Sequence, residues 1–138
     1  MIDIDLLRKK LALIESYVQD LRALGRPSEI QTDLRELRFE AYTLQISIQA
    51  ALDVAAHIVS GERMGEPRTN RQLFELLVRN GWLPEELAVS LNGMVGFRNI
   101  IVHGYEIVDA AIVEEIAHHH LADLLRFVEA IRGRLKSA

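Results

Sequence analysis

The chain contains no cysteine, no long apolar run and no surplus of basic residues, and each absence excludes a class of function. Without cysteine there is no disulfide bond, no thiolate nucleophile and no cysteine-ligated metal. No apolar run approaches the ~20 residues that span a bilayer, and residues 1–5 show no signal-peptide pattern. We therefore expect a cytoplasmic protein with no membrane partner.

The charge balance and the absence of known catalytic motifs exclude further classes of function. The chain has 16 Lys and Arg against 20 Asp and Glu, a net charge of −4. This balance argues against broad, sequence-independent binding to nucleic acid, although a small basic cleft on an acidic body stays open. There is no Walker loop, zinc-binding helix motif, serine nucleophile elbow or paired-glycine dinucleotide fingerprint. Any chemistry must therefore come from Arg, His, Asn and Tyr side chains.

Apolar residues spaced alternately by four and three predict helices, and neither a strand pattern nor an internal repeat is present. The five expected helices run over residues 5–24, from Ser28 to about Ile58, from Thr69 or Asn70 to Val78, from Pro84 to His103, and from Asp109 to about Leu135. At 138 residues, 49% of them hydrophobic, the chain is long enough for one domain, residues 1–138, with its own core. The sequence predicts an all-α, up-down bundle.

One stretch, residues 98–105, places a cation, an imidazole and a phenol among apolar residues, where such groups cost free energy unless paired or functional. Helical spacing puts Arg98 and Tyr105 on the same seam as Met94, at core-type positions. Asn99 and His103, four residues apart, line an adjacent stripe. Whatever faces Arg98 must be a carboxylate, a bound anion or a polar cleft.

Polar residues beside the long second helix have two interpretations. Gln45, Gln49 and Asp53 form a line next to its apolar seam, and Asp53 with His57 has the spacing of an i,i+4 pair. The line is either a solvated helix edge or the place where Asp53 faces Arg98. The consecutive histidines 118–120 point about 100° apart on a helix and cannot close around one metal ion, so we expect solvated or interface histidines.

Arg98 and His103 together supply the minimum for metal-free RNA cleavage. A histidine can take the proton of a 2′-OH, that oxygen can attack the adjacent phosphorus, and an arginine can stabilise the added charge. One histidine cannot also protonate the leaving oxygen, so a symmetric dimer with two copies of His103 in one cleft would complete the pair. Arg and His near a helix C-terminus are also explained by the helix dipole alone.

The residues Arg98-Asn99, His103-Gly104 and Tyr105 match the Arg-x4-His-x-Tyr motif of the HEPN superfamily. The chain as a whole resembles the HepT-like HEPN toxins of the HepT/MntA (HEPN/MNT) toxin–antitoxin systems, from "LRELRFEAYTLQISIQAALDVAAHIV" through "PRTNRQLFELLVRNGWLP" to "MVGFRNIIVHGYEIVD". The resemblance covers most of residues 1–130 and has no departure within the motif.

This resemblance implies a five-helix HEPN-type bundle that acts as a homodimer. It implies a metal-independent endoribonuclease toxin of a type VII-like system, with Arg98 and His103 of both subunits in a shared cleft. It further implies an MntA-like nucleotidyltransferase antitoxin that uses ATP and Mg to transfer AMP to Tyr105. Two alternatives remain: a non-catalytic, nucleotide-binding partner of a nucleotidyltransferase, and a dimerising bundle in which Arg98 pairs with Asp53 for structure alone.

Overall fold

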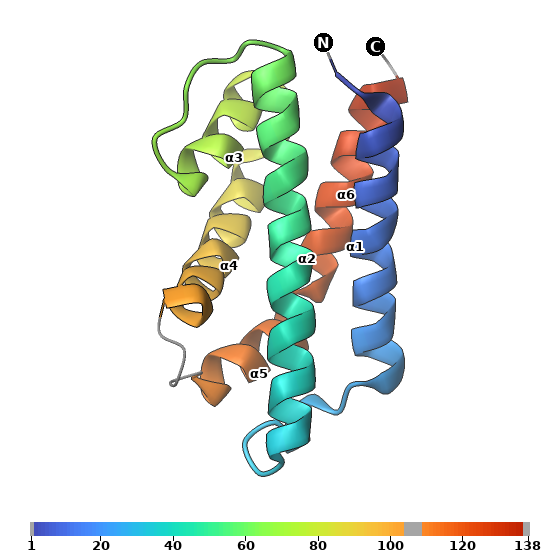
Figure 1. The fold of residues 1–138 in the computed structure, drawn as a ribbon, viewed down its shortest axis with the longest axis vertical. Helices are drawn as coiled ribbons and strands as arrows, with labels where there is room; N and C mark the ends of the chain where they lie inside the picture. The colour runs from blue at the N-terminus through green and yellow to red at the C-terminus, as the bar shows by residue number, and fades with distance from the viewer. Residues whose placement is uncertain (1, 104–108, 137–138) are drawn as a thin grey trace.

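The structure is a computed structural model that describes residues 2–103 and 109–136, without the side chains of residues 98–103. Its elements are α1 (Ile4–Leu24), the 3-10 turn η1 (Pro27–Glu29), α2 (Leu34–Gly61), α3 (Asn70–Arg79), α4 (Glu85–His103), α5 (Ala110–His119) and α6 (Leu121–Lys136). In Figure 1 the long α2 stands between the α1–α6 pair on one side and α3 with α4 on the other. The all-α prediction is confirmed, because the described residues contain no strand.

Helix α1 forms as its spacing predicts. The side chain of Asp3 accepts a hydrogen bond from the backbone N–H of Leu6 and caps the first turn. All five residues of the predicted seam are buried: Leu7, Leu11, Ile14, Val18 and Leu21. The helix ends at Gly25, where a Cβ would lie 2.3 Å from the carbonyl oxygen of Leu21. Only glycine fits that approach, so the predicted stop at Gly25 is confirmed.

The start of α2 differs from the prediction. Ser28 does not cap it, because Pro27–Glu29 form the separate turn η1. Asp33 is the cap, and its carboxylate accepts a hydrogen bond from the N–H of Arg35 at 2.9 Å. The helix therefore begins five residues later than expected, and Leu34, the first residue of its apolar seam, is 59% exposed. The seam is fully buried only from Ala41 onward.

The last predicted helix is two helices, so the described residues form six α-helices and a 3-10 turn where the sequence predicted five helices. The break lies at His120, which leaves the helical conformation with φ −124° and ψ 2°. Asp109 caps α5 as predicted, through hydrogen bonds from the N–H groups of Ala111 and Ile112. The apolar seam continues across the break, which explains why the spacing alone read as one helix.

Helices α1, α2 and α6 hold the bundle together along most of its length. The two terminal nitrogens of the Arg132 guanidinium on α6 donate hydrogen bonds to the carboxylate of Glu15 on α1, one of them at 2.8 Å. This hydrogen bond holds the pKa of Glu15 below its ordinary value despite partial burial. Phe74 and Phe127 pack edge to face, with ring centroids 5.9 Å apart, and join α3 to α6.

No helix in the described part combines the length and apolar character needed to cross a bilayer.

Candidate functional site

Helix α4 carries the predicted catalytic residues. Glu85 and Glu86 occupy its first turn, where carboxylates favour the positive end of the helix dipole. The described part of the helix runs to His103, so Arg98, Asn99 and His103 all lie in one helix, as predicted. The side chains of these three lie outside the described part of the structure, and so does the whole of Tyr105. Their mutual geometry therefore remains a prediction.

The buried face of α4 agrees with the predicted seam. Leu87, Leu91 and Met94 are all at most 2% exposed and pack into the core that α2, α3 and α6 share. Trp82 and Leu83, just before the helix, are buried as expected. Burial of this face fixes the rotation of α4 about its axis over the described side chains. The helix is thus held as a rigid support up to the residue before Arg98.

A second seam of α4 faces outward, and the sequence interpretation missed it. Val89, Gly93 and Gly96 follow one another in steps of four and three; Val89 is 68% exposed and Gly93 is exposed. A Cβ added at Gly93 or Gly96 would meet no described atom within 4 Å, so crowding within the described part of the chain explains neither glycine. Glycine inside a helix costs up to about 1 kcal/mol relative to alanine. We call Val89, Gly93 and Gly96 the open face of α4.

A pocket of about 400 Å³ adjoins the open face, between α4 and α5. Its walls are mostly apolar, and its polar side chains are Ser90, Glu115 and His120. The pocket extends the open face sideways toward α5, so a helix or loop that packed on α4 would also have a hollow to fill.

The rim of this pocket is held by a hydrogen-bonded group on three elements. Ser90 of α4 donates to the carboxylate of Asp123 in α6, and Nδ1 of His120 lies 3.2 Å from the same carboxylate oxygen. Burial raises the pKa of Asp123, but the hydrogen bonds from Ser90 and His120 outweigh it and leave that pKa below its ordinary value. Because Ser90 donates to Asp123 and not to His120, the group is no hydrolase triad. These hydrogen bonds hold the junction between α5 and α6 against α4.

The side chain of Asp53 makes its contacts on the side of α2 that faces α1. Its carboxylate pairs with Nζ of Lys10 at 3.3 Å and accepts a hydrogen bond from Nε2 of Gln49 at 2.9 Å. The ring of His57 accepts a hydrogen bond from the N–H of Asp3. These contacts join α2 to α1. The predicted pairing of Asp53 with Arg98 involves a side chain that the structure does not describe, so it stays a prediction.

The family assignment follows from comparison with known proteins. A model of the family described as Ribonuclease HepT-like matches residues 7–131, which covers all helices except the ends of α1 and α6. The chain belongs to the HepT-like ribonuclease family. The matched region contains the complete Arg98, His103 and Tyr105 motif.

Individual HepT-like relatives match three quarters of the chain or more. The mRNA nuclease HepT of Shewanella oneidensis is 31% identical over 130 residues, a match that covers 94% of this chain and 98% of that protein. The tRNA nuclease HepT of Aphanizomenon flos-aquae is 29% identical over 106 residues, covering 75% of this chain and 72% of that protein. A solved structure of the tri-AMPylated Shewanella oneidensis HEPN toxin in complex with its MNT antitoxin has a TM-score of 0.85 at 31% identity, covering 94% of this chain and 98% of that one.

The histidine run of this HepT-like chain lies at the corner between α5 and α6. His118 and His119 each approach a carboxylate one turn earlier, Glu114 at 3.4 Å and Glu115 at 3.9 Å. His120 lies between two carboxylates, 3.2 Å from Asp123 and 3.9 Å from Glu115. Among the residues that the structure describes, no group of three or more His, Asp or Glu side chains is arranged to hold a metal ion.

Proposed function

We propose that this HepT-like chain is the ribonuclease toxin of a toxin–antitoxin pair. The observation that carries the proposal is the family match over residues 7–131, which contains the intact motif, together with a helix that carries both Arg98 and His103. The nuclease names of the relatives and the toxin–antitoxin complex of the Shewanella protein support it. An RNA substrate and an ATP-using partner place the proposed reaction in the cytoplasm.

The proposed chemistry is cleavage by the RNA's own 2′-OH. His103 of one subunit takes the 2′-OH proton, the oxygen bonds to the adjacent phosphorus, and the bond from phosphorus to the 5′-oxygen breaks. His103 of the second subunit protonates that leaving oxygen. The guanidinium of Arg98 stabilises the charge on the phosphoryl oxygens, and Asn99 supports the same site from the same helix. The products are a 2′,3′-cyclic phosphate and a 5′-hydroxyl, and the step needs no metal ion.

The open face of α4 supports the homodimer that this chemistry requires. Glycines at Gly93 and Gly96 leave the backbone of α4 bare, so a second α4 could approach it closely. Exposed Val89 and the adjoining pocket add apolar surface on the same side. A two-fold contact along this face would bring both copies of the helix that carries Arg98 and His103 together. Asp53, which pairs with Lys10 of α1, is proposed to support the site from α2.

Control is proposed to act on Tyr105. The phenol oxygen would attack the α-phosphorus of ATP in the active site of an MntA-like nucleotidyltransferase, with Mg²⁺ bound there and pyrophosphate leaving. Each AMP transferred adds a phosphodiester, whose negative charge repels and blocks the RNA phosphate at the same place. The AMPylated state of the Shewanella toxin supports this step.

The ends of the RNA products test the mechanism. Purified protein is incubated with RNA in EDTA, and the fragments are analysed for their 3′ termini. The proposal expects 2′,3′-cyclic phosphates and 5′-hydroxyls without any added metal. Fragments with 3′-hydroxyl and 5′-phosphate ends, or cleavage that requires a divalent ion, would contradict attack by the 2′-OH.

A further inference from the structure

An exposed strip on α2 carries two cations and an aromatic ring. Arg35, Arg38 and Tyr42 follow one another in steps of three and four, so they share one face of the helix. All three side chains are exposed, and Tyr42 is 64% exposed, which is unusual for a tyrosine in a bundle of this size. At 1.5 Å per residue the strip extends about 10 Å along α2. We call these three residues the α2 strip.

No described carboxylate neutralises the cations of the strip. In the part of the chain that the structure describes, neither Arg35 nor Arg38 has a carboxylate within 4 Å, whereas Lys10, Arg126 and Arg132 are all ion-paired. The acidic residues nearest in sequence are committed elsewhere. Asp33 caps α2, Glu36 accepts a hydrogen bond from the backbone N–H of Arg26, and the side chain of Glu40 is completely buried.

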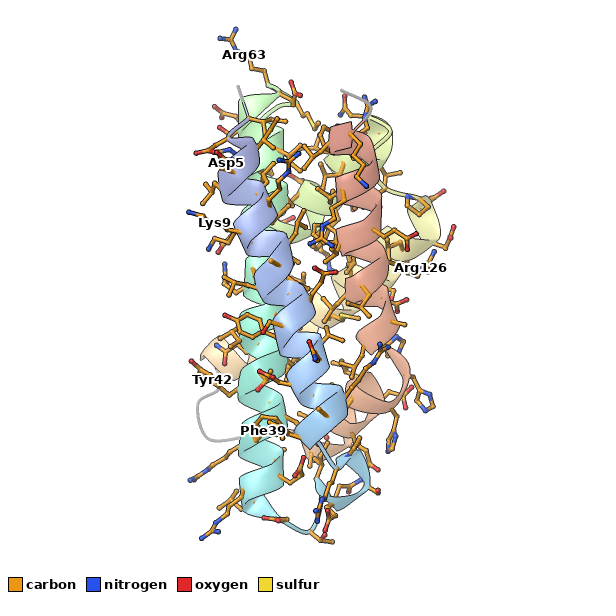
Figure 2. All side chains as sticks on the ribbon, turned by 90° about the vertical axis from the view of Figure 1, so that its right-hand side faces the viewer. Asp5, Lys9, Phe39, Tyr42, Arg63 and Arg126 are labelled. Atoms are coloured by element: carbon orange, nitrogen blue, oxygen red, sulfur yellow. The ribbon has the colours of Figure 1, made fainter. Side chains whose placement is uncertain are left out.

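The strip lies on the side of the molecule where α4 ends. Helix α2 packs against α4, and in Figure 1 the orange end of α4 lies beside the lower half of α2. In Figure 2, Tyr42 is labelled at the outer edge of α2, at the height of the end of α4 and on the same side. Arg63, another exposed cation, is labelled at the opposite end of the molecule. A chain bound at the end of α4 could therefore continue across the α2 strip.

We propose that the α2 strip binds single-stranded RNA next to the cleavage site, with phosphates on Arg35 and Arg38 and a base stacked on Tyr42. This inference rests on the proposed ribonuclease function. Arginine forks match phosphate oxygens, and an exposed aromatic ring binds a base of any sequence by stacking. On a chain with net charge −4, RNA affinity depends on such local groups of unpaired cations.

The salt dependence of RNA binding separates the contribution of the two arginines from that of Tyr42. The full-length dimer carrying His103→Ala, which cannot cut, is titrated with a fluorescein-labelled single-stranded RNA over a range of salt concentrations. Adding Arg35→Gln with Arg38→Gln should weaken binding and flatten the plot of log affinity against log salt by about 1.4, because each lost phosphate contact removes about 0.7. The matched control, Arg63→Gln with Arg68→Gln, removes two exposed cations elsewhere and should leave the slope unchanged.

Tyr42 has its own readout. Tyr42→Ala should weaken binding by roughly 10-fold without a change in salt slope, because stacking carries no counterion release, and Tyr42→Phe should restore it. Thermal unfolding of each variant shows whether the fold is intact, which the exposure of the strip leads us to expect.

The outcomes also separate this inference from the function on which it rests. If wild-type protein neither cuts nor binds RNA, the proposed function fails. If wild type cuts RNA but the strip variants bind it as tightly and with the same salt slope as their parent, the α2 strip inference alone is overturned. Loss of nucleotidyltransferase binding with unchanged RNA binding would overturn it too, and would assign the strip to the protein partner.

Discussion

Glu40 is a buried carboxyl group whose removal should stabilise the protein at neutral pH. The side chain has no exposed surface. Burial, and then the neighbouring carboxyl of Glu36, raise the pKa of Glu40 from 4.5 to about 8. At pH 7 the folded protein therefore holds a proton on Glu40 that the unfolded chain releases.

The sign and size of the effect follow from that difference. Because the folded state binds the extra proton, the contribution of Glu40 is most favourable below its unfolded pKa of 4.5 and is lost as pH rises toward 8. The loss is about 1.4 kcal/mol per pH unit, so unfolding free energy should fall by roughly 2–3 kcal/mol between pH 5 and pH 7 on this account. Glu40→Gln keeps the shape and removes the ionisation, so it should abolish that fall.

Urea unfolding of wild type and Glu40→Gln at a series of pH values measures this directly. The variant should be more stable than wild type by about 3 kcal/mol near pH 7, and the gap should shrink to about 1 kcal/mol or less at pH 5. Glu129→Gln is the matched control, since Glu129 is an exposed carboxylate on α6 and should produce no such pH-dependent gap. Parallel curves for wild type and Glu40→Gln across this range would refute the reasoning.

Two further changes have defined outcomes. Tyr105→Phe keeps the ring but removes the acceptor oxygen, so it should still cut RNA yet gain no AMP mass when incubated with the cognate nucleotidyltransferase, ATP and Mg²⁺; equal labelling would place the acceptor elsewhere. Asp109→Ala removes the cap of α5 and should lower the unfolding free energy by about 1 kcal/mol, while Asp109→Asn, which can still accept the N–H groups, should cost less; equal loss in both would show that the cap is not the cause.

The parts of the fold that local spacing determines were predictable. The buried seam of α1, its stop at Gly25 and the presence of Arg98 and His103 in one helix each depend on residues within one or two turns. The predicted start of α2 was wrong because Ser28 and Asp33 both carry suitable capping groups. The turn at Pro27–Glu29 contains Ser28, so Asp33 caps the helix. Such a choice is made by packing rather than by local propensity.

The features that depend on distant residues could not be read from the sequence. The break at His120 is held by Asp123 and Ser90, and Ser90 lies on another helix. The burial of Glu40 requires the approach of Gly25, whose added Cβ would lie 3.2 Å from a Glu40 oxygen. Of the candidate site, the motif residues and their common helix were predictable, whereas the open face of α4 appeared only once α4 was packed.

Cleavage of RNA by wild type and His103→Ala, measured side by side in EDTA, tests the central claim most directly. Because His103 is proposed as the acid–base group of both subunits, the variant should lose at least the ~10²–10⁴-fold expected for one such group while wild type stays active without metal. Thermal unfolding should match between the two, so that the loss reports chemistry. Equal activity of His103→Ala and wild type, or wild-type activity that vanishes in EDTA, would contradict the account.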